Sequence, residues 1–252
     1  LTSTTLPAAS SIFGTKTIII DTTAPTFVSV AATDGTYIVG GNIDITVTYN
    51  EAVSVTGTPT LTLSNGATAT YTSGNGTTAL VFRYTVVEAQ TDSADLSVSS
   101  YSGVIGDVAG NTAGAASGDL GAVIVDANSP TFVSVAATDG TYIVGDNIDI
   151  TVTYNEAVSV TGTPTLTLSN GATATYTSGN GTTALVFRYT VVEAQTDSAD
   201  LSVSSYSGVI GDVAGNTAGA ASGDLGAVIV DANSPVITVT SGTDTVESGN
   251  TW

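Results

Sequence analysis

The chain has 252 residues, of which 42% are hydrophobic, and its formal net charge is -19. This hydrophobic content favours a folded protein over a disordered acidic tail, and three basic residues against 22 acidic ones argue against a nucleic-acid or anionic-membrane partner. The chain has no Cys and no His, so a metal site would need oxygen ligands, and no apolar run approaches the roughly 20 residues of a membrane helix.

A repeat of 105 residues divides the chain, and the segment Asp-Ala-Asn-Ser-Pro marks each boundary. It occurs at 126–130 and 231–235, and Asp-Thr-Thr-Ala-Pro occupies 21–25. The two full copies differ at four pairs of positions: Thr22/Ala127, Thr23/Asn128, Ala24/Ser129 and Gly41/Asp146. The period predicts the last strand of a preceding module over 1–20, modules over 21–125 and 126–230, and the start of a further, truncated module over 231–252.

Within the first copy, alternating hydrophobicity and turn residues predict about seven short strands and no helix. The predicted strands cover 26–31, 42–50, 60–63, 67–71, 79–87, 96–101 and 122–125. Asn65-Gly66 between two apolar runs predicts a hairpin, and the alternation around Arg83 places this side chain on the solvent face. The expected fold of each module is an immunoglobulin-like Greek-key β-sandwich, without the Cys pair and core Trp of antibody domains.

Alternating strand directions sort the acidic loop residues into the two ends of each module. The end at which the chain enters would carry Asp21, Glu51, Asp107 and Asn111 in the first copy and Asp126, Glu156, Asp212 and Asn216 in the second. The opposite end would carry Asp92 and Asp95, or Asp197 and Asp200, and Asp231 begins the third boundary. At each joint, acids of one module are therefore expected to meet acids of the next.

Crowded carboxylates repel one another, whereas Ca²⁺ takes about 6 to 8 oxygen ligands and would stabilise them. The sequence therefore predicts Ca²⁺ at the joints; Mg²⁺ fits less well because it keeps several waters. The alternative is that these residues only form turns and are solvated, which we expect for Asp34, Asp44 and Asp119.

Four motifs together resemble the Ig-like tandem repeats of giant bacterial surface adhesins. They are Asp-Thr-Thr-Ala-Pro, Tyr-Asn-Glu-Ala-Val-Ser-Val-Thr-Gly-Thr-Pro, Ala-Leu-Val-Phe-Arg-Tyr-Thr-Val-Val and Gly-Asp-Val-Ala-Gly-Asn, and the resemblance covers each full repeat and both flanks. It implies an extender stalk on the bacterial cell surface, stiffened by Ca²⁺ at the junctions and often exported by type I secretion. The family's ligand positions match Asp21, Glu51, Asp107 and Asn111, and their equivalents Asp126, Glu156, Asp212 and Asn216. The third boundary, at Asp231, lacks its matching Glu and loop within the chain.

The expected function is therefore structural, in an extracellular protein whose partners are its own neighbouring repeats. An enzyme is not expected, because His and Cys are absent and Asp92 with Asp95 falls at a joint. Two alternatives remain open. One is a filament or surface-layer subunit that self-associates by strand donation. The other is a Ca²⁺-dependent carbohydrate-binding module with Tyr37 and Tyr142 stacking on a sugar, although we expect these rings rather to cover the end of the core.

Overall fold

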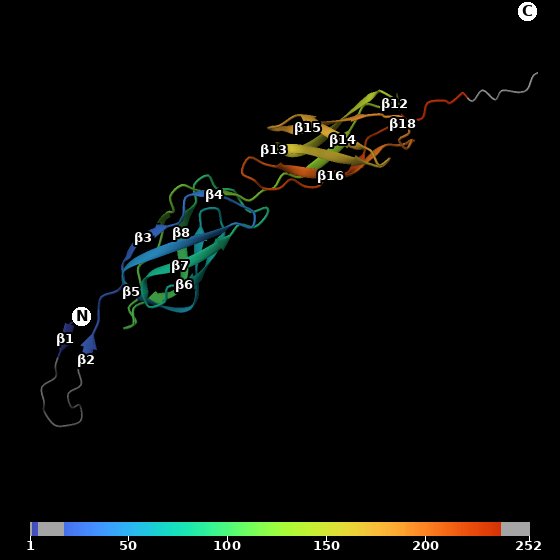
Figure 1. Ribbon diagram of the computed structural model, residues 1–252. Coiled ribbons are helices and arrows are strands. Elements are labelled where there is room, and N and C mark those ends of the chain that lie inside the picture. Colours follow the sequence, from blue (N-terminus) through green and yellow to red (C-terminus); the bar gives the residue numbers. More distant parts are fainter. Residues whose placement is uncertain (1, 5–17, 238–252) are drawn as a thin grey trace, which may run out of the picture. The chain divides into compact units, whose positions relative to one another are not determined.

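A computed structural model describes residues 2–4 and 18–237 (Figure 1). The described residues form β-strands and connecting turns with no helix, and the large sheets are antiparallel, consistent with a β-sandwich. Accordingly, the described part of the chain contains no helix long and apolar enough to cross a membrane. Two short strands, β1 (Thr2–Thr4) and β2 (Ile18–Ile20), pair antiparallel ahead of the first repeat. Of the predicted further module, Val236 and Ile237 are not in a strand, and 238–252 lie outside the described residues.

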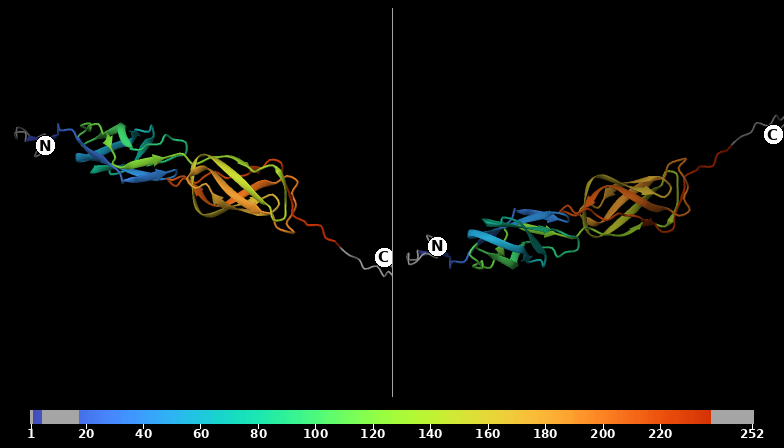
Figure 2. Two further views of the ribbon diagram at one scale, coloured as in Figure 1. Left: turned by 90° about the horizontal axis from the view of Figure 1, so that it is seen from above. Right: turned by 90° about the horizontal axis from the view of Figure 1, so that it is seen from below.

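The described residues divide into two compact units. One contains the residues up to Pro130 together with Gly211–Gly219, and the other contains Thr131–Ile210 and the residues from Ala220 onward. In each unit the strands surround a common interior, as the two further views in Figure 2 show.

The first repeat is built from eight strands. These are β3 (Phe27–Ala31), β4 (Gly35–Ile38), β5 (Asn42–Leu63), β6 (Thr68–Ser73), β7 (Thr77–Thr85), β8 (Ser97–Gly106), β9 (Gly118–Asp119) and β10 (Val123–Asp126). The main sheet has the order β6-β7-β5-β8-β9, with β3 also paired to β5, while β4 and β10 form a separate parallel pair.

The second repeat has the same strands and pairings. These are β11 (Phe132–Ala136), β12 (Gly140–Ile143), β13 (Asn147–Leu168), β14 (Thr173–Ser178), β15 (Thr182–Thr190), β16 (Ser202–Gly211), β17 (Gly223–Asp224) and β18 (Val228–Asp231). Strand β12 pairs parallel with β18, as β4 does with β10.

Strand β5 runs without a break through 22 residues, whereas the sequence predicted two strands over 42–50 and 60–63. Its first half pairs with β3 and β7, and its second half pairs with β6 and β8. The register with β7 shifts between Thr48 and Val53. Since β6 also pairs with β7, the sheet rolls back on itself through β5. The short strands β4 and β9 were not predicted.

The core follows the predicted alternation. Ile43, Ile45 and Val47 of β5 are fully buried, as are Leu80 and Phe82 of β7. Between the buried positions of β7, Arg83 is exposed and binds Asp44 directly across the strand pair. The predicted Asn65-Gly66 hairpin is confirmed between β5 and β6, where Gly66 has a φ of 83°. Burial on alternate positions is what two-layer packing of a β-sandwich requires.

Candidate metal site

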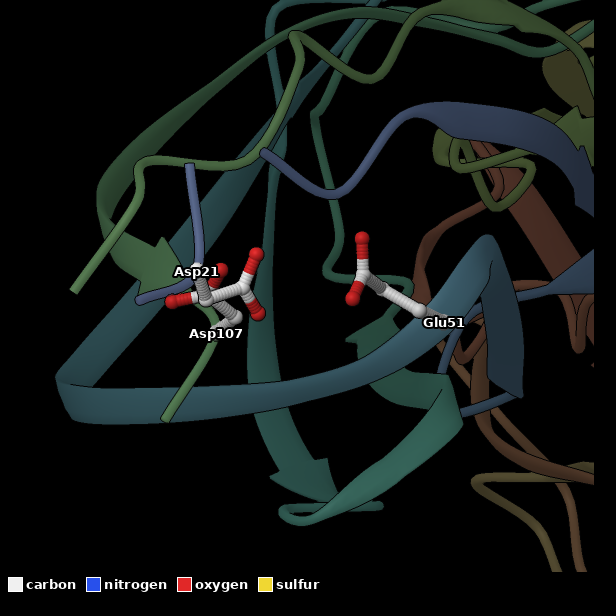
Figure 3. A group of neighbouring side chains, drawn as sticks. All are labelled: Asp21, Glu51 and Asp107. Carbon is white, nitrogen blue, oxygen red and sulfur yellow. The ribbon is translucent and has the colours of Figure 1, made fainter. Parts of the chain in front are cut away.

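Three carboxylates gather where the chain enters the first repeat: Asp21, Glu51 and Asp107 (Figure 3). Each offers an oxygen atom within 4.8 Å of the other two, and the described part of the chain contains no other group of three or more acidic residues this close. Two oxygens bound to the same Ca²⁺ at about 2.3 to 2.6 Å lie at most about 5 Å apart. The spacing of the group is therefore compatible with one shared Ca²⁺.

Asp107 is positioned by the tight loop that follows β8. Its Oδ1 accepts hydrogen bonds from the backbone N–H of Gly110 at 2.7 Å and of Asn111 at 2.8 Å. Two glycines are required here, because a Cβ on Gly106 would lie 2.6 Å from the Asn111 carbonyl oxygen and Gly110 has a φ of 98°. The Gly-Asp-Val-Ala-Gly-Asn motif thus folds into a loop that points the Asp107 carboxylate in one fixed direction.

Asn111 connects this loop to the segment that enters the module. Its side-chain Nδ2 donates to Asp107 Oδ2 at 2.7 Å and to the Asp21 carbonyl oxygen at 3.2 Å. The sequence predicted Asn111 as a ligand; here its amide nitrogen faces the acids. In this arrangement Asn111 positions Asp21 and Asp107.

Glu51 lies inside β5, at the register shift between Thr48 and Val53, and not in a loop after a strand as the sequence predicted. Irregular pairing at such a point redirects a side chain without ending the strand. The preceding Asn50 holds the incoming segment, because its Oδ1 accepts a hydrogen bond from Thr26 N at 2.7 Å and its own N–H donates to the Thr26 carbonyl. Glu51 is thereby fixed close to the segment that carries Asp21.

Asp107 is nearly buried, with an exposed fraction of 8%. The hydrogen bond from the Asn111 side chain, with further bonds from the loop backbone, lowers its pKa despite the opposing effect of burial. No described cationic side chain is available to it, because Arg83 and Arg188 each bind another carboxylate, Asp44 and Asp149. The nearly buried carboxylate of Asp107, beside two further carboxylates, is therefore not neutralised by a cationic side chain of the described residues.

The second repeat brings Asp126, Asp212 and Asn216 together within one compact unit. Asn216, which is 2% exposed, donates from Nδ2 to Asp212 Oδ2 at 2.8 Å and to Asp126 Oδ1 at 3.1 Å. Burial raises the pKa of Asp126, and repulsion by Asp212 and Asp92 raises it further. The described residues form no second group of three carboxylates, and Glu156 belongs to the other unit.

The acids predicted at the opposite end of each module have a different environment. Asp92 Oδ1 accepts hydrogen bonds from Ala127 N and Asn128 Nδ2, both at 2.8 Å, and Asp197 does the same with Ala232 and Asn233. Asp95, Asp200 and Asp231 are exposed and belong to no carboxylate group among the described residues.

Glu88 was not singled out from the sequence. It accepts hydrogen bonds from both the N–H and the hydroxyl of Ser129. The sequence difference that could have indicated this contact is at the third residue after the boundary Asp, which is Ala24 at the first boundary and Ser129 at the second.

Tyr37 and Tyr142, the predicted sugar-stacking residues, are half-buried. The Tyr37 hydroxyl donates to the Thr33 carbonyl at 2.9 Å and its ring packs against the core, while Tyr142 donates to Thr138 at 2.8 Å.

Comparison of the chain with protein-family models and with curated proteins gives no match. Its function is therefore inferred from its own residues.

Proposed function

We propose that this chain is a structural segment of an extracellular bacterial stalk, built from tandem immunoglobulin-like modules and stabilised by Ca²⁺ where the chain enters a module. The observation that carries the proposal is the nearly buried Asp107 carboxylate beside Asp21 and Glu51, with no cationic side chain near them among the described residues. A divalent cation would offset the mutual repulsion of these groups.

The residues fit Ca²⁺ in type as well as in spacing. Asp21, Glu51 and Asp107 would supply carboxylate oxygens, the ligand class that Ca²⁺ prefers, and bound waters can complete its shell. Asp107 Oδ2 accepts a hydrogen bond from Asn111, and a carboxylate oxygen can take a second partner. Because Asp21 precedes the first strand of the module, an ion on these three residues would tie the incoming segment to β5 and to the loop after β8.

The stalk assignment rests on the two near-identical repeats, on the resemblance of their motifs to adhesin repeats and on the nature of the site. Two near-identical copies in tandem suit a spacer, in which length and stiffness matter more than chemistry. Extracellular modules bind Ca²⁺ with a Kd of about 0.1 to 1 mM, so occupancy would follow the calcium of the surroundings.

The test is small-angle scattering and calorimetry of the chain in Ca²⁺, in Mg²⁺ and in chelator. We expect Ca²⁺ to raise the melting temperature and to narrow the distribution of conformations, and Mg²⁺ to do so weakly. If Ca²⁺ changes neither the melting temperature nor the distribution of conformations, the proposal fails. Light scattering distinguishes a monomeric stalk segment from a filament subunit, and glycan-array binding would favour the carbohydrate-binding alternative.

A further inference from the structure

The segment that follows β10 is held by the loop between β7 and β8 of the same module. Glu88 Oε1 accepts a hydrogen bond from Ser129 N at 3.0 Å, and its Oε2 accepts one from the Ser129 hydroxyl at 2.7 Å. Asp92 Oδ1 accepts from Ala127 N and from Asn128 Nδ2, both at 2.8 Å. We call Glu88 and Asp92 the linker clamp, because together they bind three consecutive residues of the linker.

The backbone of the loop adds a further contact. Ala89 N donates to the Ala127 carbonyl oxygen at 2.9 Å, and Ala127 is completely buried. Ala89 itself has a φ of 64°, which is rare for a residue with a Cβ. Such a conformation persists only where surrounding contacts enforce it. The loop is therefore held in a costly shape that presents the clamp to the linker.

The second repeat reproduces every element of this arrangement. Glu193 accepts from the N–H and the hydroxyl of Ser234, at 3.0 and 2.6 Å. Asp197 accepts from Ala232 N and Asn233 Nδ2, both at 2.8 Å, and Ala194 has a φ of 65°. The residues after Pro130 and after Pro235 differ in sequence, so the arrangement depends on the linker and its own module.

The linker ahead of the first repeat lacks the two side-chain donors that the clamp binds and the buried Ala beside them. Thr22 replaces the buried Ala127, Thr23 replaces the amide of Asn128, and Ala24 replaces the hydroxyl of Ser129. All three residues are exposed. Three of the four differences between the repeats thus fall on the three linker positions that the clamp contacts.

We propose that the end of each module formed by Glu88 and Asp92, or by Glu193 and Asp197, is a recognition site for a linker of sequence Ala-Asn-Ser, and that it discriminates against Thr-Thr-Ala. A Thr at position 127 brings extra atoms into a space filled by a methyl group. The change at position 128 removes one of the two donors to Asp92 Oδ1, and the change at position 129 leaves Glu88 Oε2 without its donor. The linker is thereby matched to the module that precedes it. This inference is independent of the proposed Ca²⁺ site.

The test is amide hydrogen exchange of the full chain, followed by mass spectrometry in chelator. Peptides that span 126–132 and 231–237 differ in sequence, so the two linkers are measured in the same molecule. Replacing Ala127-Asn128-Ser129 by Thr-Thr-Ala should accelerate exchange across the first of these linkers about five- to tenfold, the loss expected for a hydrogen bond. Exchange across 231–237 should stay unchanged.

Two conservative variants separate recognition from folding. Ser129→Ala removes one donor, and Glu88→Gln retains an acceptor without the charge, so each should accelerate exchange by a smaller factor at the same linker. Glu193→Gln should act only on 231–237. The proposal is wrong if the Thr-Thr-Ala linker keeps its full protection, or if any of these variants accelerates exchange equally at both linkers.

Discussion

Replacing Glu51 by Gln should stabilise the chain in chelator and reduce the further stabilisation that Ca²⁺ provides. Among the described residues the Glu51 carboxylate makes no hydrogen bond or ion pair, so the substitution removes a charge from the site and leaves the loop around Asp107 intact. Two unit charges 4.8 Å apart repel by roughly 1 kcal/mol in water and by about 3.5 kcal/mol at an effective dielectric constant of about 20. In chelator, Glu51→Gln should therefore raise the free energy of unfolding by roughly 1 to 3 kcal/mol.

The native chain should gain more stability from Ca²⁺ than the variant does. With a Kd of about 0.1 mM, 10 mM Ca²⁺ adds about 2.7 kcal/mol to the native protein. If one lost carboxylate weakens binding about tenfold, the variant gains only about 1.4 kcal/mol under the same conditions. At about 4 °C per kcal/mol for a module of this size, the Ca²⁺-dependent rise in melting temperature should fall from about 11 to about 6 °C.

Differential scanning calorimetry of the chain with increasing Ca²⁺ measures both effects. Asp119→Asn is the matched control, since it also removes one charge but keeps the acceptor for Gly121 N. The control should keep the full response to Ca²⁺. The reasoning is refuted if Glu51→Gln and Asp119→Asn respond alike, or if Glu51→Gln lowers stability in chelator.

Three further predictions concern stability and need no metal. Burial raises the pKa of Tyr49 to about 12, so its hydroxyl stays neutral, and this hydroxyl has no hydrogen-bond partner among the described residues. Because Tyr49→Phe removes an unpaired buried hydroxyl, it should leave the free energy of unfolding unchanged or raise it by about 1 kcal/mol in a denaturant titration. Gly41→Asp should raise the free energy of unfolding by about 0.5 to 1 kcal/mol, because Asp146 at the equivalent position accepts a hydrogen bond from Ile143 N at 3.0 Å and because Gly has more conformational freedom in the unfolded chain. A lower free energy of unfolding would show that the 2.9 Å contact of the new Cβ with the Ile38 carbonyl oxygen cannot relax. The hydrogen bonds from Ser129 lower the pKa of Glu88 below 4.5, so the contribution of this carboxylate to the stability of the folded chain is complete above pH 4.5 and is lost as the pH falls through the lowered pKa. The difference in melting temperature between the native chain and Glu88→Gln should therefore vanish in acid. A difference that stays constant with pH would contradict this.

Much of the fold could be predicted because its signals are local. The alternation of buried and exposed residues in β5 and β7 follows directly from the sequence, and Asn65-Gly66 specifies its hairpin. The continuity of β5 could not be predicted, because Gly57 and Pro59 are typical of a loop and only the pairing of the second half with β6 and β8 makes it a strand. Strand β4 exists through its parallel partner β10, which lies far away in the sequence.

The candidate site was only partly accessible from the sequence. Strand directions brought Asp21, Glu51 and Asp107 to one end of the module, and the structure places their oxygens close together. The role of Asn111 depends on which atom of its amide faces the acids, and residue type does not specify that. Asp92 was predicted as a ligand, and its contact with the linker could not be predicted, because it depends on the backbone and side-chain donors of Ala127 and Asn128 that bind its Oδ1.

The parallel pairing of β4 with β10 has a mechanical consequence. The pair runs from Gly35 beside Val123 to Ile38 beside Asp126, and β10 leads directly into the linker. Tension on that linker acts along the strand, so it loads the hydrogen bonds of the pair in shear, and they must yield together. In a hairpin pulled open from one end, the bonds would instead break one after another. A module with this connection resists extension best along the direction in which the chain leaves it.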